Sequence, residues 1–176
     1  MSTPKAPGGY NTVNSFIITE DAPGMISFLT TVFGAHEVPE AHTLDDDGLI
    51  LHSELKVGDS TVMVAARKPD WPFTPSLLQV YVHDIDATLA TAQGLGATVV
   101  TTPTEFFGDR LSRLVDPWSN LWWIYQHSGE APEWDNSGTD WGEMNTEEDT
   151  GWTPETTPEL VYIHDTLLTT MKGLGR

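Results

Sequence analysis

Two stretches of the chain repeat one pattern of apolar and polar residues. Residues 14–21 and 77–84 are short apolar runs closed by an aspartate, which predicts a strand that ends at a helix cap. Segments with helical periodicity follow over residues 22–33 and 85–95, and a Gly-Ala pair comes after each of them. Glycine is common where helices end. The pattern therefore predicts an internal repeat.

The second parts of the two copies also match, because each has two apolar runs around a turn signal. These runs and turns are 49–55, 57–60 and 61–65 in the first copy, and 111–115, 116–120 and 121–125 in the second. Each copy thus predicts a strand hairpin after its helix. We expect an α+β fold of paired βαβββ modules, at about 10–68 and 75–128, that build a curved mixed sheet with a concave face. A ferredoxin-like pair is the alternative.

The remaining parts of the chain differ in composition from the repeat. Residues 1–9 predict a disordered N-terminus, and 10–128 the folded domain. Residues 129–176 predict an acidic tail that contains tryptophans and ends in a short amphipathic helix, which begins at Thr157-Pro158-Glu159. The tail tryptophans Trp134, Trp141 and Trp152 predict docking on the same chain or on a second subunit, with a partner-binding motif as the alternative.

Charge and composition exclude several classes of function. The formal net charge of −18 disfavours nucleic acid and anionic membrane surfaces as partners. The chain has no cysteine, which excludes disulfides and thiolate sites. Residues 1–9 lack the apolar run of a secretory signal, and we find no apolar stretch long enough to span a membrane. We therefore expect a cytoplasmic protein.

Several of these segments, in this order, resemble one known superfamily. They are DAPGMISFLTTVFGA from Asp21, HSELKVGDS from His52, VYVHDID from Val80, FGDR from Phe107 and DPWSNLW from Asp116. Together they resemble the vicinal oxygen chelate superfamily of glyoxalases, bleomycin-resistance proteins and dioxygenases, most closely its PhnB-like branch. The resemblance covers about residues 10–127 and implies paired βαβββ modules, joined as a homodimer or in an equivalent arrangement, and, in the enzymes, one divalent metal on the concave face.

The residues at the implied metal positions do not suit a metal. By position these residues are Asn14, Met63, Leu77 and Trp123. Leucine, methionine and tryptophan offer no imidazole or carboxylate donor for a catalytic divalent ion. We therefore expect no metal and no cofactor, and the resemblance then favours the bleomycin-resistance type of protein, which holds a small molecule without reacting it.

Strand alternation predicts which side chains line the concave face. Together with the loop around residues 107–110, this alternation yields a set of candidate ligand-binding residues: Asn14, Phe16, Gln79, Tyr81, Phe107, Arg110, Trp123 and Tyr125. The alternative is that these side chains fill the core, or that Arg110 pairs with an acid. His52 is the candidate general base, and otherwise a structural histidine. Asp116 with Pro117 indicates a structural turn.

Three functions follow from these observations. The first is metal-free binding of a small molecule, by a homodimer, in an aromatic pocket. The second is an enzyme of the same superfamily, a lyase, isomerase or dioxygenase, whose non-standard site uses His52 with an unusual metal set or His52 and Arg110 without metal. The third is a protein-interaction module that acts through the acidic tail.

Overall fold

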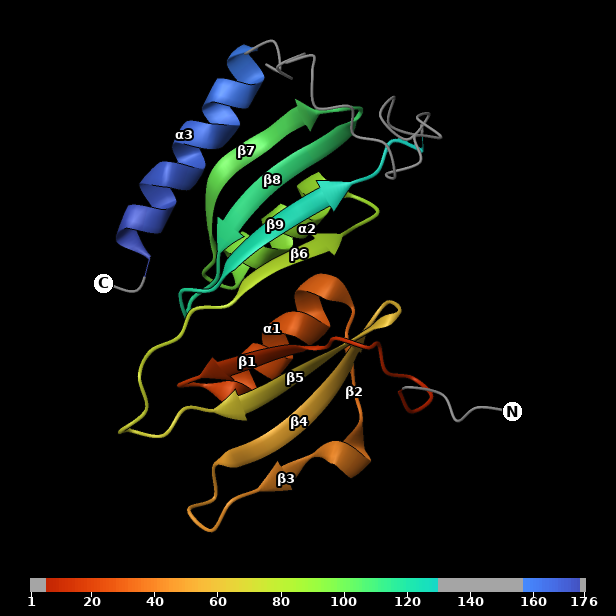
Figure 1. Ribbon diagram of the computed structural model, residues 1–176, viewed down its shortest axis with the longest axis vertical. Helices are drawn as coiled ribbons and strands as arrows, with labels where there is room; N and C mark the ends of the chain where they lie inside the picture. Colours follow the sequence, from red (N-terminus) through yellow and green to blue (C-terminus); the bar gives the residue numbers. More distant parts are fainter. Residues whose placement is uncertain (1–5, 130–156, 175–176) are drawn as a thin grey trace, which may run out of the picture.

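The computed structural model describes residues 6–129 and 157–174, and the repeat predicted from the sequence is visible in it (Figure 1). The first copy contains β1 (Ser15–Thr19), α1 (Ala22–Phe33), β2 (His36–Glu37), the 3-10 turn η1 (Pro39–Ala41), β3 (Thr43–Leu44), β4 (Ile50–Val57) and β5 (Ser60–Ala66). The second contains β6 (Leu77–Tyr81), α2 (Ile85–Gly94), β7 (Thr98–Phe106), β8 (Asp109–Val115) and β9 (Leu121–Gln126). The predicted α+β class is confirmed.

Both helices begin at the aspartates that the sequence marked. Asp21 Oδ1 accepts a hydrogen bond from Gly24 N at 2.9 Å, and Asp84 Oδ1 accepts one from Ala87 N at 2.9 Å. These bonds satisfy backbone donors that the first turn of a helix leaves free. At the end of α1, Gly34 adopts φ 65°, a conformation that glycine takes without strain.

The strands form two mixed sheets, each with a free edge strand. The first sheet has the order β1-β5-β4-β2, with β3 paired to β4, and the second has the order β6-β9-β8-β7. In each copy the first strand pairs in parallel with the last, β1 with β5 and β6 with β9. The predicted curved sheet thus consists of two sheets, whose edge strands β1 and β6 both border one cavity of about 280 Å³.

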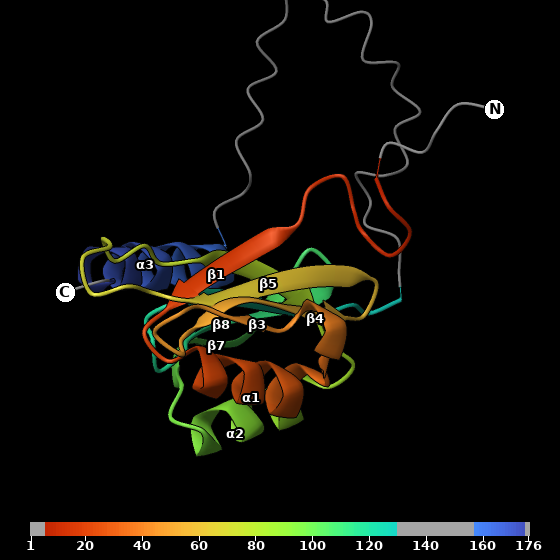
Figure 2. The same ribbon diagram turned by 90° about the horizontal axis from the view of Figure 1, so that it is seen from below.

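Helices α1 and α2 cover the same side of the two sheets (Figure 2). One apolar core runs through both modules and joins Ile17, Phe28 and Leu55 to Leu89 and Ile124. Aromatic rings of α1 contact the second module, because Phe28 lies 6.0 Å from Trp118 and Phe33 lies 4.8 Å from Trp122 between ring centroids. The modules therefore fold around a shared interior.

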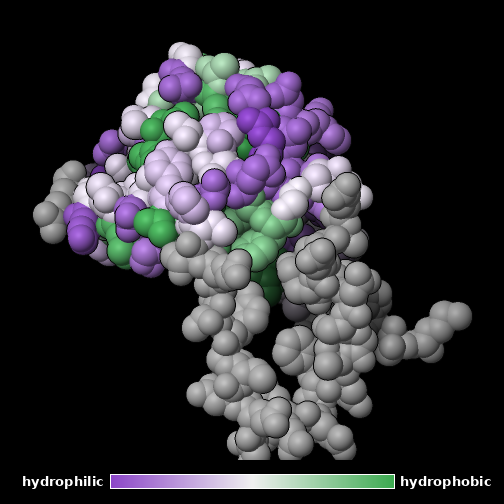
Figure 3. All heavy atoms as spheres, turned by 90° about the horizontal axis from the view of Figure 1, so that it is seen from above, coloured by the Kyte–Doolittle hydropathy of each residue, from purple (hydrophilic) through white to green (hydrophobic). Residues whose placement is uncertain are grey.

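The predicted C-terminal helix is present as α3 (Pro158–Gly173) and packs on β7. Thr157 caps it, with its Oγ1 accepting from Leu160 N at 3.3 Å. Ile163 is its buried anchor, and Thr166 Oγ1 lies 2.8 Å from Thr101 Oγ1. Seen from above the view of Figure 1, the described surface mixes hydrophilic residues with separate small hydrophobic patches (Figure 3).

Parts of the chain lie outside the described residues. These are residues 1–5, 130–156 and 175–176, so the predicted docking of Trp134, Trp141 and Trp152 lies outside the described residues. Within residues 6–9, Gly9 O accepts from Lys56 Nζ at 2.7 Å. None of the described helices is long and apolar enough to cross a membrane.

Candidate functional site

The face of the two sheets opposite α1 and α2, which we call the open face, gathers most of the predicted ligand-binding residues. In the first sheet the register sets Phe16 beside Met63 and Met63 beside Glu54. In the second sheet it sets Gln79 beside Trp123 and Tyr81 beside Tyr125. Their neighbours along each strand, such as Ile17 and Ile124, belong to the core beneath the helices. Alternation along the strands therefore brings these side chains to one face.

Aromatic rings form a continuous cluster at one end of the open face. Tyr81 and Tyr125 lie 5.4 Å apart between centroids, Phe106 lies 6.1 Å from Tyr125, and Phe107 lies 4.9 Å from Phe106. Burial raises the pKa of Tyr125, while Tyr81 is 59% exposed. The cluster thus has a half-buried base, formed by Phe106 and Tyr125, and an accessible top, which suits stacking of a flat ring.

Phe107 occupies a strained position in the turn between β7 and β8. Its φ is 50° and that of Gly108 is 86°, so both residues of this two-residue turn have left-handed backbone. Such turns favour Asn-Gly, and a bulky residue with positive φ is unfavourable. Phe107 is nevertheless 50% exposed there. Strain at an exposed aromatic residue is typical of a functional position.

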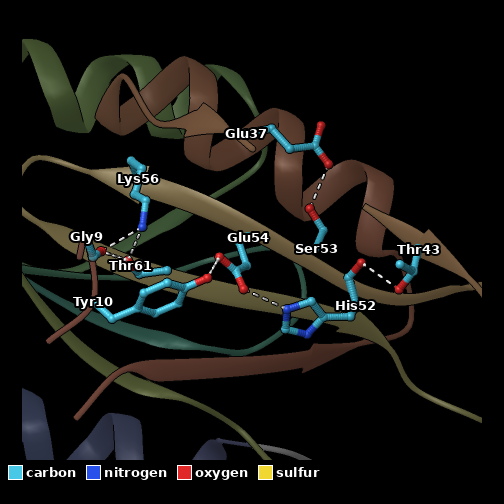
Figure 4. A network of polar contacts seen from close by, with 9 residues as sticks. All are labelled: Gly9, Tyr10, Glu37, Thr43, His52, Ser53, Glu54, Lys56 and Thr61. Atoms are coloured by element: carbon cyan, nitrogen blue, oxygen red, sulfur yellow. Dashed lines mark hydrogen bonds and ion pairs between the residues drawn. The ribbon is translucent and has the colours of Figure 1, made fainter. Parts of the chain in front are cut away.

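On the first sheet, Glu54 is at the centre of a polar network (Figure 4). Its Oε2 accepts from the Tyr10 hydroxyl at 2.6 Å, and its Oε1 lies 3.1 Å from His52 Nε2. The hydrogen bonds from Tyr10 and then His52 lower the pKa of Glu54 below its ordinary value and keep it ionised. The His52 side chain remains 33% exposed, with its ring 5.9 Å from that of Phe16.

On the second sheet, Arg113 takes the place that Glu54 has on the first, beside the last strand of its module. Its guanidinium lies 5.2 Å from the Trp123 ring centroid and donates to Ile163 O of α3 at 2.7 Å. Arg113 is 4% exposed, and its Nε is a buried donor without a partner in the described structure. Burial lowers the pKa of Arg113. Helix α3 therefore covers this part of the open face.

Sequence reasoning missed both Glu54 and Arg113. The signal was available, because Glu54 alternates with His52 along one strand. Arg113 pairs with Trp123 in the hairpin that the 116–120 turn predicts.

Two predicted site residues lie apart from the cluster. Arg110 donates to both carboxylate oxygens of Asp86 on α2, at 2.8 and 3.3 Å, so its charge is used on the side that the helices cover. This is the acid pairing that the sequence left open. Asn14 precedes β1 and exchanges two hydrogen bonds with the backbone of Asn11, at 2.8 and 3.1 Å.

The residues at the metal positions implied by the resemblance do not fit a divalent ion. Met63, Leu77 and Trp123 are thioether, hydrocarbon and indole side chains, and the Asn14 amide is bound to Asn11. Among residues 6–129 and 157–174, no three His, Asp or Glu side chains are placed to hold a metal. Divalent ions of the catalytic type need imidazole or carboxylate donors. We therefore derive no chemistry through a metal.

The family model described as the Glyoxalase/Bleomycin resistance protein/Dioxygenase superfamily matches residues 10–124. The chain belongs to this superfamily. The match spans both βαβββ modules and ends within β9. The narrower placement in a PhnB-like branch stays a prediction.

The chain is also similar to two uncharacterized proteins and to several solved structures. The uncharacterized proteins Mb0911c of Mycobacterium bovis and Rv0887c of Mycobacterium tuberculosis are each 29% identical over 122 residues, which is 62% of this chain and 79% and 71% of theirs. Among solved structures, a glyoxalase/bleomycin resistance protein/dioxygenase family enzyme of Burkholderia phytofirmans PsJN has a TM-score of 0.54 at 22% identity, over 64% of this chain and 95% of its own. TioX of Micromonospora sp. ML1 has a TM-score of 0.50 at 21% identity, over 68% and 98%. These structures support the fold.

Proposed function

We propose that the protein binds or sequesters a small, flat organic molecule on its open face without a resident metal. The observation that carries this proposal is the aromatic cluster of Phe106, Phe107, Tyr81 and Tyr125 on the face that α1 and α2 leave uncovered. Phe16, on the neighbouring sheet, is 47% exposed and borders the cavity of about 280 Å³. Exposed aromatic side chains on one surface are typical of ligand sites.

The donor chemistry of the face supports binding without metal. On this face Glu54 is held by Tyr10 and His52, and Arg113 is held by α3. The homodimer and the cytoplasmic location predicted from the sequence belong to this proposal. Native mass spectrometry, with an acid-denatured sample beside it, measures the oligomer, any metal and any retained small molecule together.

Titration with 2-naphthol, a flat neutral probe, tests the open face by isothermal calorimetry. We expect Phe16→Ala and Tyr81→Ala each to weaken binding about fivefold, because each removes a ring contact worth about 1 kcal/mol. Leu95→Ala is the matched control, since Leu95 is 43% exposed just after α2 and lies on the other side of the sheets. Equal affinities for the three variants would contradict the proposal.

A second candidate is metal-free acid–base catalysis by His52. A carboxylate beside one ring nitrogen fixes the orientation of an imidazole and leaves the other nitrogen for a substrate, and Glu54 lies in that position. If a retained ligand is converted, we expect His52→Ala to abolish turnover while ligand binding persists. Turnover that survives in this variant would exclude the role. Arg110 is not brought near His52, and the interaction role of the tail stays a prediction.

A further inference from the structure

One cavity lies between the two modules on the side of α1 and α2, and its lining extends to Gln79 and Tyr81, which also belong to the open face. It has a volume of about 670 Å³, within the range typical of small-molecule sites. Its apolar floor includes Val32 and Phe33 of α1, Leu78 and Val80 of β6, and Trp122 of β9. Phe33 and Trp122 are in ring contact at 4.8 Å. The floor therefore suits an apolar or aromatic body.

The rim of the cavity is acidic. Asp59, from the β4–β5 turn, and Asp84, before α2, both line it, and no lysine or arginine does so. Each carboxylate already accepts one short bond through Oδ1, from Ser60 Oγ at 3.0 Å and from Ala87 N at 2.9 Å. In the described part of the chain no hydrogen bond reaches the second oxygen of either group. These two oxygens therefore remain for a ligand, and the Arg110 guanidinium interacts electrostatically with the Asp84 charge without a hydrogen bond to it.

The net charge of the whole chain also favours a cationic ligand. The formal net charge is −18, and such a field draws cations toward the surface and repels anions. Local and overall charge thus select the same sign of ligand.

We propose that this cavity is a second binding site, which takes a small organic cation with an apolar body, such as an arylalkylamine. The apolar body lies on the floor around Phe33 and Trp122, and the ammonium group is held at the rim by Asp59 and Asp84. This site shares Gln79 and Tyr81 of β6 with the open face, but its apolar floor is formed by side chains on the opposite side of the sheets.

Three probes of one shape test the selection of charge. They are 1-naphthylmethylamine, 1-naphthylmethanol and 1-naphthylacetate, titrated calorimetrically into the full-length protein. We expect the amine to bind at least fivefold more tightly than the alcohol, and the acetate to bind weakest. Because the carboxylates are at the rim, added salt should reduce the preference for the amine. Equal affinity for amine and alcohol, or no binding of the amine, would overturn the proposal.

Substitutions at the rim test the carboxylates. In the Asp59→Asn/Asp84→Asn double variant, we expect the amine to bind no better than the alcohol. Asparagine caps helices about as well as aspartate, so α2 should still form. Asp46→Asn, in the exposed turn before β4, is the control that should bind like the wild type. Persistence of the amine preference in the double variant would contradict the assignment.

A pair of substitutions on α2 tests the location. Ala87 lines the cavity and is exposed, so Ala87→Phe fills the site without disturbing the core, and we expect at least tenfold weaker binding of amine and alcohol. Ala90 is equally exposed on the same helix and does not line the cavity, so Ala90→Phe should have no effect. Phe16→Ala should also leave amine binding unchanged, which separates this site from the open face.

Two results would overturn the location. The first is amine binding that survives Ala87→Phe. The second is a dimer, seen by native mass spectrometry, that Ala87→Phe dissociates and Ala90→Phe does not. That result would make the cavity an interface between two copies of the chain.

Discussion

Helices α1 and α2 begin in the same way but meet different surroundings. Each is capped by an aspartate that accepts from the third residue after it, Gly24 in α1 and Ala87 in α2. A Cβ added at Gly24 would lie 2.7 Å from Trp118 Cζ2, because Trp118 of the second module packs against the start of α1. Ala87 instead borders the open cavity of about 670 Å³.

The difference arises from the turns that face the two helices. The β4–β5 hairpin closes through Gly58 and Asp59 alone, whereas the β8–β9 turn is longer and presents Trp118. Asp116 organises the longer turn, since its carboxylate accepts from Trp118 N, Asn120 N and Trp122 Nε1 at 2.9 to 3.0 Å. Burial raises the pKa of Asp116, although these hydrogen bonds oppose the rise. The longer β8–β9 turn therefore fills the space between the modules beside α1. The short β4–β5 turn leaves the matching space beside α2 open as a cavity.

The largest expected effect comes from removing the ring that fills the first junction. Trp118→Ala deletes the contact with Phe28 and should lower the free energy of unfolding by about 3 kcal/mol, measured by urea denaturation. Asp59→Ala, in the matching turn, should cause no measurable loss, because Asp59 is exposed beside the open cavity. Equal losses in the two variants would show that the junctions are packed alike.

The next largest effect concerns the first turns of α1 and α2, at Gly24 and Ala87. Gly24→Ala should destabilise the protein by about 2 kcal/mol, because the new methyl group meets Trp118 and the Asp21 carboxylate. Ala87→Gly should cost about 1 kcal/mol or less, as expected for helix propensity alone. In a double-mutant cycle, Trp118→Ala should relieve much of the Gly24→Ala penalty. If the two losses in free energy of unfolding simply add, the strain in Gly24→Ala does not come from contact with Trp118.

A smaller effect concerns the open face and pH. Tyr10→Phe removes the largest cause of the lowered pKa of Glu54. A carboxyl whose pKa is lower in the folded state stabilises the fold above its unfolded pKa, and this contribution is lost as the pH falls through the folded pKa. The variant should therefore lose less stability than the wild type between about pH 5 and pH 3. Parallel pH profiles in urea denaturation would argue against the Tyr10–Glu54 bond.

The smallest effect compares the hairpin turns. Gly58 supplies a left-handed residue in the β4–β5 turn, with φ 57°, and Phe107 supplies one in the β7–β8 turn, with φ 50°. Phe107→Asn should raise the free energy of unfolding by about 1 kcal/mol, because asparagine tolerates this backbone. The same variant should weaken 2-naphthol binding if Phe107 contributes to the open-face site. Unchanged stability would mean that contacts of the Phe107 ring offset the strain.

Local pattern predicted most of the architecture. The helix predicted over residues 22–33 matches α1, and the one predicted over 85–95 ends one residue beyond α2. Both begin at capping aspartates, which act on neighbouring backbone and are readable from the sequence. The strand β7 was not resolved by the pattern, because its polar threonines do not alternate with apolar residues.

The open face was predictable in part. Strand alternation placed Phe16, Tyr81 and Trp123 on one face, since the side-chain period of a strand is a local property. Arg110 is positioned by its ion pair with Asp86 of α2, and Arg113 is buried because α3 packs over it. Alternation predicts neither contact. Contacts between elements far apart in sequence carry no local period, so alternation does not reveal them.

The sequence by itself determined the repeat and the helix starts, which depend on residue type and spacing. Its resemblance to the superfamily, which the family model shows, also implied metal positions whose residues offer no suitable donor. Only the tertiary structure decided that Trp118 fills one junction while the other stays open, and that Glu54 and Arg113 occupy matching places on the two sheets. The physical reason is that cavities and buried charges depend on which distant side chains meet, and packing of the whole chain sets those meetings.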